Sequence, residues 1–275
     1  MRIGVLIRFR KEIDVLQEMQ KVKDMGLQTC QLSCFDPSMY NDEWAEKVNA
    51  ASKETGITVS TLWAGWSGPA EWDHIYGPAT LGLVPVAYRA MRLKELMAAI
   101  PFAKRIGVDQ IATHVGFLPD NPDHPDYIGT IGALRYLCRE MKKENISFLF
   151  ETGQETPLTI LRAIEDIGTD NLGINFDTAN LIIYGKGNPV DALRVFGKYV
   201  KDLHIKDGVF SDQGRVRGHE VPHGEGHVDF PVVIKMLKEL GYSGPYTIER
   251  EISGEKQIQD IISARDMLLK IDQET

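Results

Sequence analysis

The chain repeats one pattern eight times: a short apolar run, rich in β-branched residues, is followed by a longer stretch with helical periodicity. The expected strands are 2–7, 28–33, 57–63, 109–114, 146–151, 172–177, 201–205 and 245–249. The expected helices lie near 11–25, 42–55, 86–105, 128–144, 157–167, 188–198, 231–240 and 256–270. Because parallel strands need a crossover between them, this order indicates an α/β fold with a parallel sheet.

Eight such units in 275 residues favour a closed (β/α)8 TIM barrel, which typically takes about 250 residues. An open doubly wound sheet usually has fewer strands and carries G-x-G-x-x-G after its first strand. Here the first strand continues into Arg8-Phe9-Arg10. Since no linker, low-complexity tract or break in composition divides the chain, we predict a single barrel domain over residues 1–275.

Glycine and proline fall where βα units need them. A glycine between a helix and the next strand suits the left-handed position that ends a helix, and this holds for Gly26, Gly56, Gly107 and Gly241. A proline suits the first helical turn, where no N–H is required, and this holds for Pro157, Pro189 and Pro231. Two long inserts, 63–85 and 206–230, follow strands at the end where barrels place their chemistry.

The charge and the cysteines narrow the class of protein. With 39 acidic and 31 basic residues, the net charge of −8 argues against a nucleic-acid partner, because phosphate backbones are bound mainly by positive charge. No stretch approaches the roughly 20 apolar residues of a membrane span, and no secretion signal opens the chain. Three cysteines make no disulfide framework. We therefore expect a cytoplasmic enzyme with a small-molecule substrate.

Four successive strands end in a polar residue that can bind metal: Glu151, Asp177, His204 and Glu249. Each follows an apolar run, and a single polar residue there would only mark the strand's exit from the core. Neighbouring barrel strands lie about 4.8 Å apart, so four inward-leaning side chains at one level converge. The sequence thus predicts one cluster at the mouth of the barrel.

Three carboxylates at one point repel each other and take up protons unless a cation keeps them ionised. Oxygen ligands with one imidazole suit one divalent ion of manganese (Mn²⁺), magnesium (Mg²⁺), cobalt (Co²⁺) or zinc (Zn²⁺), and the set does not choose among them. Because no cysteine is among the ligands, we expect a catalytic site with open positions rather than a structural zinc site.

Several motifs at these strand ends resemble those of the xylose-isomerase-like barrel superfamily, which includes ketose 3-epimerases, inosose dehydratase, hydroxypyruvate isomerase and endonuclease IV. The resemblance covers essentially the whole chain. The motifs are Glu151-Thr-Gly-Gln, Phe176-Asp177-Thr-Ala-Asn180, His204-Ile-Lys-Asp207, Gly224-Glu-Gly-His-Val-Asp-Phe230 and Ile248-Glu249.

The resemblance implies that Glu151, Asp177, His204 and Glu249 hold one metal ion and that Glu151 and Glu249 form the acid/base pair. It implies an isomerase or epimerase that acts on a keto sugar or sugar phosphate, by proton transfer through a metal-stabilised enediolate. A lyase of the inosose dehydratase type would use the same intermediate. Family members are often homo-oligomers, either dimers or tetramers.

The same motifs leave two further alternatives, DNA repair and sugar binding without catalysis. Endonuclease IV binds three metals and has histidine where this chain has Asn180, and its extra His and Asp ligands find no match before Gly224. DNA repair is therefore disfavoured. Ketose 3-epimerases also often have a substrate-binding histidine at the position of Asn180, although asparagine can bind a sugar hydroxyl. A non-catalytic sugar-binding barrel is the other alternative.

Four residues are predicted to bind substrate: His114, Asn180, Arg217 and Trp66. His114 ends the fourth strand, where the alternative is a hydrogen-bonded histidine beneath a loop. Trp66 belongs to an aromatic insert with Trp63, Trp72 and Tyr76, which would pack on sugar C–H faces or anchor the loop.

Arg217 lies in the second insert, where the epimerases have a substrate-binding arginine, and Arg215 or Lys206 are alternatives. The usual phosphate site of a barrel would lie near Lys206, Arg217 and Arg250. His223 and His227 are predicted to shape this insert, and Asp229 to cap the helix that follows it.

Overall fold

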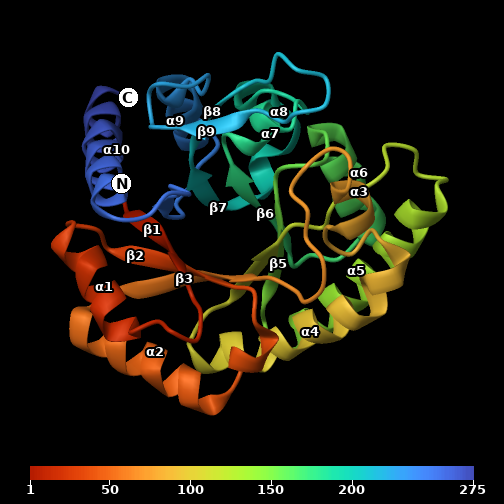
Figure 1. Ribbon diagram of the computed structural model, residues 1–275, viewed down its shortest axis with the longest axis horizontal. Coiled ribbons are helices and arrows are strands. Elements are labelled where there is room, and N and C mark those ends of the chain that lie inside the picture. The colour runs from red at the N-terminus through yellow and green to blue at the C-terminus, as the bar shows by residue number, and fades with distance from the viewer.

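The computed structural model describes residues 1–275, and its eight parallel strands close into a barrel (Figure 1). The strands are β1 (Ile3–Arg8), β2 (Thr29–Cys34), β3 (Thr58–Ala64), β4 (Gln110–Thr113), β5 (Ser147–Glu151), β6 (Leu172–Asp177), β7 (Val200–Ile205) and β10 (Tyr246–Ile248). Each strand begins and ends within one residue of its predicted bounds. Strand β1 pairs with both β2 and β10, which closes the sheet.

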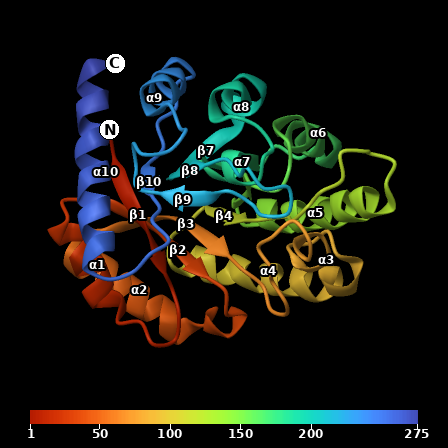
Figure 2. The same cartoon turned by 45° about the horizontal axis from the view of Figure 1, so that its top comes forward.

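Eight helices surround the barrel and cover the outer face of the sheet (Figures 1 and 2). They are α1 (Val15–Asp24), α2 (Asp42–Thr55), α4 (Val86–Arg105), α5 (Pro125–Lys143), α6 (Pro157–Ile167), α8 (Pro189–Phe196), α9 (Phe230–Glu239) and α10 (Glu255–Glu274). The predicted (β/α)8 barrel is therefore confirmed. No helix combines the length and the apolar character that a membrane crossing would need.

The predicted punctuation of the units is present. Gly26, Gly56, Gly107 and Gly241 all have positive φ, and Gly56 ends α2 with its N–H bonded to Ser52. The three prolines each occupy the first turn of a helix. Asp229 caps α9 by accepting the N–H of Val232, as predicted. The three cysteines are buried free thiols.

A buried carboxylate ties three strands together inside the barrel, below the site. Asp202 of β7 accepts hydrogen bonds from Ser60 and Thr61 of β3, at 2.9 and 2.7 Å, and from Thr247 of β10, at 3.2 Å. The N–H of Leu203 supplies the fourth bond, at 2.8 Å. Because every oxygen of this buried group is satisfied, it fixes the relative height of strands that carry site residues.

The first insert contains short helix α3 (Gly77–Thr80) and is organised by one buried arginine. Arg92 of α4 is fully buried, and its guanidinium donates to the carbonyl oxygens of Ser67, Pro69, Thr80 and Gly82 at 2.6–3.2 Å. The insert has no periodic apolar face that would pack it on the core, and hydrogen bonds to this arginine hold its backbone in place instead.

The second insert forms an antiparallel hairpin of β8 (Asp207–Val209) and β9 (His219–Val221), which was not predicted. Asp207 accepts the N–H groups of Gly208, Gly224, Gly226 and Val228 at 2.8–3.2 Å. A Cβ on Gly226 would lie 2.1 Å from the Asp207 carboxylate. The Gly224-Glu-Gly motif is thus required to wrap the insert around this carboxylate.

Four further short elements were not predicted. They are η1 (Pro37–Met39), α7 (Asn180–Ile183), η2 (Gly197–Tyr199) and α3 of the first insert. All have three or four residues, which is too short for periodicity to identify them.

We predict that Arg92→Leu lowers the free energy of unfolding by about 3 kcal/mol, because four backbone carbonyls lose a charged donor. The urea midpoint, followed by tryptophan fluorescence, measures the loss. Lys94→Met, at an exposed position of the same helix, is the control and should leave the midpoint unchanged. Equal midpoints for both variants would contradict the assigned role of Arg92.

Candidate metal centre and active site

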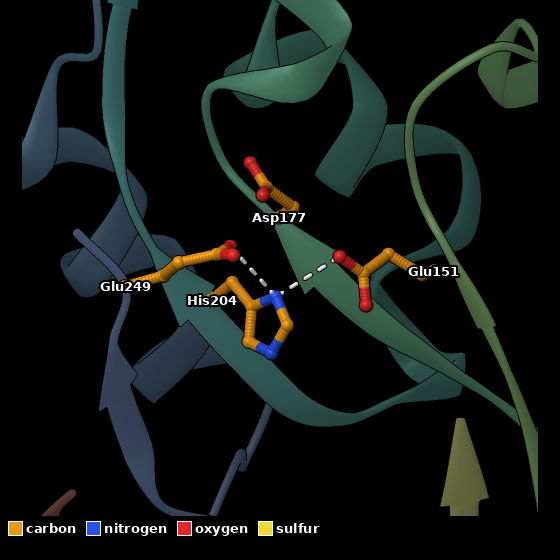
Figure 3. Close-up of side chains that lie close together, drawn as sticks. All are labelled: Glu151, Asp177, His204 and Glu249. Atoms are coloured by element: carbon orange, nitrogen blue, oxygen red, sulfur yellow. Dashed lines mark hydrogen bonds and ion pairs between the residues drawn. The ribbon is translucent and has the colours of Figure 1, made fainter. Parts of the chain in front are cut away.

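Four ligand-bearing residues converge at the carboxyl ends of neighbouring strands (Figure 3). Glu151 ends β5, Asp177 ends β6, His204 lies in β7, and Glu249 directly follows β10; these four strands are consecutive around the barrel. His204 is in register with Asp177 on one side and with Thr247 on the other. One ligand atom from each residue lies within 4.8 Å of the others.

The imidazole of His204 presents Nδ1 to the cluster. Nδ1 lies 3.0 Å from Glu151 Oε1 and 3.1 Å from Glu249 Oε2 (Figure 3). On the other side of the ring, Nε2 lies 2.9 Å from Gln31 Oε1, to which it donates. A hydrogen bond that holds the proton on Nε2 leaves the lone pair of Nδ1 for a metal.

Glu151 is anchored through one oxygen and open through the other. Its Oε2 accepts from Trp63 Nε1 at 2.5 Å and from Asn175 Nδ2 at 2.7 Å. Asn175 is itself held by Gln31, whose Nε2 donates to its Oδ1 at 3.0 Å. These bonds orient the carboxylate so that Oε1 faces His204 and the cavity.

Two carboxylate oxygens of the cluster are buried without a hydrogen bond. Asp177 uses Oδ1 to accept the N–H groups of Ala179 and Asn180, both at 2.8 Å, and leaves Oδ2 free. Glu249 Oε2 accepts no hydrogen bond either, although His204 Nδ1 is nearby. Ligands on opposite sides of a divalent ion lie about 4 Å apart. The spacing and the unsatisfied oxygens therefore fit one such ion.

The ionisable groups of the cluster shift one another's pKa values. Burial would lower the pKa of His204, but the carboxylates of Glu151 and Glu249 raise it well above its ordinary value. Burial would raise the pKa of Glu151, but the charges of His204 and His114 lower it. Burial raises the pKa of Asp177 well above its ordinary value. Protons and a bound cation therefore compete for these ligands.

Lys206 is a second positive group inside the site. It is 3% exposed, and its Nζ lies 3.5 Å from Glu249 Oε2, 3.6 Å from Asp177 Oδ2 and 2.6 Å from Glu251 Oε1. Burial would lower its pKa, but Glu249, Glu251 and Asp177 raise it well above the ordinary value. Lys206 therefore stays charged beside the quartet.

A cavity of about 550 Å³ opens over the quartet. Three of the four predicted substrate-binding residues line it: His114, Asn180 and Arg217. His114 Nε2 lies 3.4 Å from Glu151 Oε1, and Asn180 Oδ1 lies 3.4 Å from Lys206 Nζ. Burial lowers the pKa of His114, which favours its neutral form.

Trp66, the fourth residue predicted to bind substrate, is not among the residues that line this cavity. Its ring is 3% exposed and lies behind the lining, 6.1 Å from the ring of Trp63 and 6.3 Å from that of Trp72. Trp63 and Trp72 line the cavity instead, together with Phe35, whose ring is 4.8 Å from that of Trp63. Trp63 and Trp72, rather than Trp66, are therefore the tryptophans that could contact a substrate.

The basic residues of the second insert separate into distinct roles. Arg217 lies at the cavity with its guanidinium 5.8 Å from the ring of Tyr184, whereas Arg215 is exposed and outside the lining. Arg250 is bound by Glu220 at 2.7 Å and Asp260 at 2.9 Å. Arg250 is therefore paired with two carboxylates, and it does not line the cavity.

Both histidines of the insert make the loop contacts expected of them. His223 Nε2 donates to the carbonyl of Ile205 at 2.7 Å, and His227 Nδ1 accepts the N–H of Phe210 at 3.4 Å. The first bond connects the segment after β9 to β7, and the second connects it to the residue that follows β8.

Gln31, Asn175 and Trp63 support the quartet, a role that was not predicted from the sequence. A local signal exists for Asn175: it lies two residues before Asp177 in an apolar strand, so alternation turns both side chains to the same face. Gln31 is likewise a polar residue within a buried strand. Their partners, however, come from other strands and are not visible locally.

Glu155 is a second buried acid near the site, and its burial was not predicted from the sequence. It lies in the loop after β5 and is 2% exposed, and neither carboxylate oxygen accepts a hydrogen bond from another group. Burial raises the pKa of Glu155 from 4.5 to about 8. It is therefore mostly neutral at pH 7.

Comparison with known proteins gives the same fold. The family model described as "Xylose isomerase-like TIM barrel" matches residues 19–271. The crystal structure of a xylose isomerase domain protein from Planctomyces limnophilus has 34% sequence identity and a TM-score of 0.91, over 99% of this chain and 97% of that one.

Two curated relatives align with different extents. The L-ribulose-5-phosphate 3-epimerase UlaE of Escherichia coli is 26% identical over 278 residues, which cover 91% of this chain and 87% of that enzyme. An uncharacterized protein of Methanocaldococcus jannaschii is 32% identical over 119 residues. That match covers 41% of this chain and only 36% of the archaeal protein, so this chain spans about a third of that relative.

We predict that Glu155→Gln stabilises the protein at alkaline pH. The folded-state pKa of about 8 exceeds the ordinary 4.5, so folding binds a proton between these values and stability falls as the pH rises through this window. The neutral variant avoids this loss. Its unfolding free energy should equal that of wild type near pH 4.5 and exceed it by about 1 kcal/mol or more at pH 9.

Urea midpoints across this pH range test the prediction. Glu165→Gln, at an exposed position of α6, is the matched control and should show no difference that grows with pH. A Glu155→Gln midpoint that runs parallel to wild type at every pH would refute the buried neutral state.

Proposed function

The chain belongs to the xylose isomerase-like TIM barrel family, and on that basis we propose that it is a divalent-metal-dependent isomerase or epimerase of a keto sugar. The main support is the quartet of Glu151, Asp177, His204 and Glu249 beneath an open cavity. A curated relative that acts as a sugar-phosphate 3-epimerase, similar over most of its length, supports the same class.

Glu151, Asp177, Glu249 and Nδ1 of His204 would hold the metal. A divalent cation there would supply Lewis acidity that polarises the substrate carbonyl and favours loss of the adjacent proton. The supporting shell of Gln31, Asn175 and Trp63 orients the ligands for this task.

Glu151 and Glu249 are suited to move the proton from opposite sides. They come from β5 and β10, which two other strands separate around the barrel, and both line the cavity. If one carboxylate removes a proton next to the carbonyl and the other returns one to the opposite face, the carbon is inverted. If the proton returns to the neighbouring carbon, an aldose and a ketose are interconverted.

Lys206 would lower the cost of the negative charge that develops on the substrate. Three ligand carboxylates surround the reacting region, and the ammonium group lies 3.5–3.6 Å from two of them. It also lines the cavity, where a substrate oxygen can reach it. A fixed positive charge in a buried site stabilises an oxyanion far more than it would in water.

Hydrogen exchange in D₂O tests the proposed activity. Keto sugars and their phosphates are incubated with protein and Mn²⁺, Mg²⁺, Co²⁺ or Zn²⁺, with EDTA as the metal-free control. Metal-dependent deuterium uptake in a product of otherwise unchanged composition supports an isomerase or epimerase. Loss of water instead would identify a lyase, and absence of exchange with every sugar would reject the proposal.

We predict that Glu151→Gln and Glu249→Gln each reduce kcat at least about a hundredfold, since each removes a proton-transfer group. Glu225→Gln, in the exposed loop at the same end of the barrel, should retain wild-type activity. Either site variant keeping more than about a tenth of wild-type activity would exclude that residue from proton transfer.

We predict that Lys206→Met lowers kcat about a hundredfold and changes KM less, whereas Lys206→Arg recovers part of the rate because it restores the charge. Steady-state kinetics on the metal-loaded protein measures both effects. A purely structural lysine would show a lowered melting temperature and unchanged kcat in Lys206→Met, and that result would contradict its role in charge stabilisation.

A further inference from the structure

Three arginine side chains at the cavity lack a carboxylate partner: Arg8, Arg10 and Arg217. We propose that they bind an anionic group of the substrate, so that the protein acts on a phosphorylated or carboxylated keto sugar. This inference rests on the proposed function and specifies its substrate class.

The carboxylates near these arginines are already paired with lysines. Asp36 contacts Lys11 at 2.9 Å, and Glu251 contacts Lys206 at 2.6 Å. The single hydrogen bond of the Arg8 side chain is a long one, 3.5 Å, to the carbonyl of Glu251. The Arg10 side chain makes none. In a chain of net charge −8, three guanidinium groups without a carboxylate partner at one cavity suit an anionic ligand.

Other arginines of the protein show the contrast. Arg89, Arg105, Arg194 and Arg250 each pair with an aspartate or glutamate. Six others also lack a carboxylate partner, but they do not line the cavity: Arg2, Arg92, Arg135, Arg139, Arg162 and Arg215. Unpaired arginine is therefore not rare here, and the gathering of three at the catalytic cavity is what requires an explanation.

The fold presents these guanidinium groups from two directions. Arg8 ends β1, and Arg10 lies two residues further along the chain, the spacing that turns extended residues to one side. Arg217 comes from the β8–β9 hairpin that follows β7 (Figure 2). Tyr184 supports it through its ring face. Planar guanidinium groups bind phosphate and carboxylate oxygens in bidentate fashion.

Two of the three basic residues expected at the usual phosphate position of a barrel already have carboxylate partners. Of the basic residues near the ends of β7 and β10, Arg250 is bound by Glu220 and Asp260, and Lys206 is committed to Glu251 and the quartet. The free positive charge lies instead on β1 and on the hairpin. An anionic group bound there would leave the carbonyl end of the sugar to Glu151 and Glu249.

The experiment compares metal-loaded wild type with the Arg8→Gln/Arg10→Gln double variant. Deuterium exchange is measured on matched substrates: a neutral ketose, its terminal phosphate ester and the corresponding keto sugar acid. We expect kcat/KM for one of the anionic substrates to exceed that for the ketose about tenfold or more in wild type. In the double variant, kcat/KM for that anionic substrate should fall to that variant's own value for the neutral ketose.

The two anionic arms identify which group is bound, and preference for either one supports the proposal. Arg139→Gln, on the exposed surface of α5, is the matched control and should keep the full preference. Arg8→Lys/Arg10→Lys should retain part of it. Equal exchange of neutral and anionic sugars by wild type would overturn the proposal while leaving the isomerase function intact.

If no sugar takes up deuterium and the proposed function fails, a direct binding measurement still tests the anion site. Inorganic phosphate is titrated calorimetrically into metal-free protein, so that it cannot bind at a metal. A dissociation constant that rises about tenfold or more in the Gln double variant, with the Arg139→Gln control unchanged, supports an anion site. Identical isotherms for wild type and the double variant would overturn it.

Discussion

The mutual repulsion of three buried carboxylates is the constraint on which the site depends. Glu151, Asp177 and Glu249 place oxygens within 4.8 Å of one another, where they cannot all stay ionised without positive charge. His204 and Lys206 supply that charge within the protein, and the oxygens of Asp177 and Glu249 that accept no hydrogen bond remain available for a cation. The chain therefore buries these carboxylates, at a cost in desolvation and repulsion, at a position where a metal ion would stabilise them.

The barrel makes this arrangement rigid. The four strands that carry the ligands are consecutive and are joined by backbone hydrogen bonds. Below the ligands, Asp202 fixes the positions of β3, β7 and β10 along the barrel axis relative to one another. The two inserts are organised by single buried charged groups, Arg92 in one and Asp207 in the other. Each group satisfies several backbone partners at once, so hydrogen bonds to one buried side chain hold each insert in place.

The cavity has two unlike sides. Strands β5 to β10 contribute the quartet and Lys206, which are the groups suited to proton transfer. The first three strands and the segments after them contribute the aromatic wall of Phe35, Trp63 and Trp72 and the arginines at positions 8 and 10. This division places the proposed chemistry on one half of the barrel, and the aromatic wall with two of the three unpaired arginines on the other.

The sequence by itself determined the eight βα units to within one residue at the strands and the convergence of Glu151, Asp177, His204 and Glu249. Both follow from local periodicity, because alternation and the parallel direction of strands decide which side chains meet. Only the tertiary structure decided which tryptophans face the cavity, namely Trp63 and Trp72 rather than Trp66. It also decided that Arg250 is paired with Glu220 and Asp260, and that Glu155 is buried. These outcomes depend on contacts between distant segments and on irregular inserts, for which no periodic pattern exists.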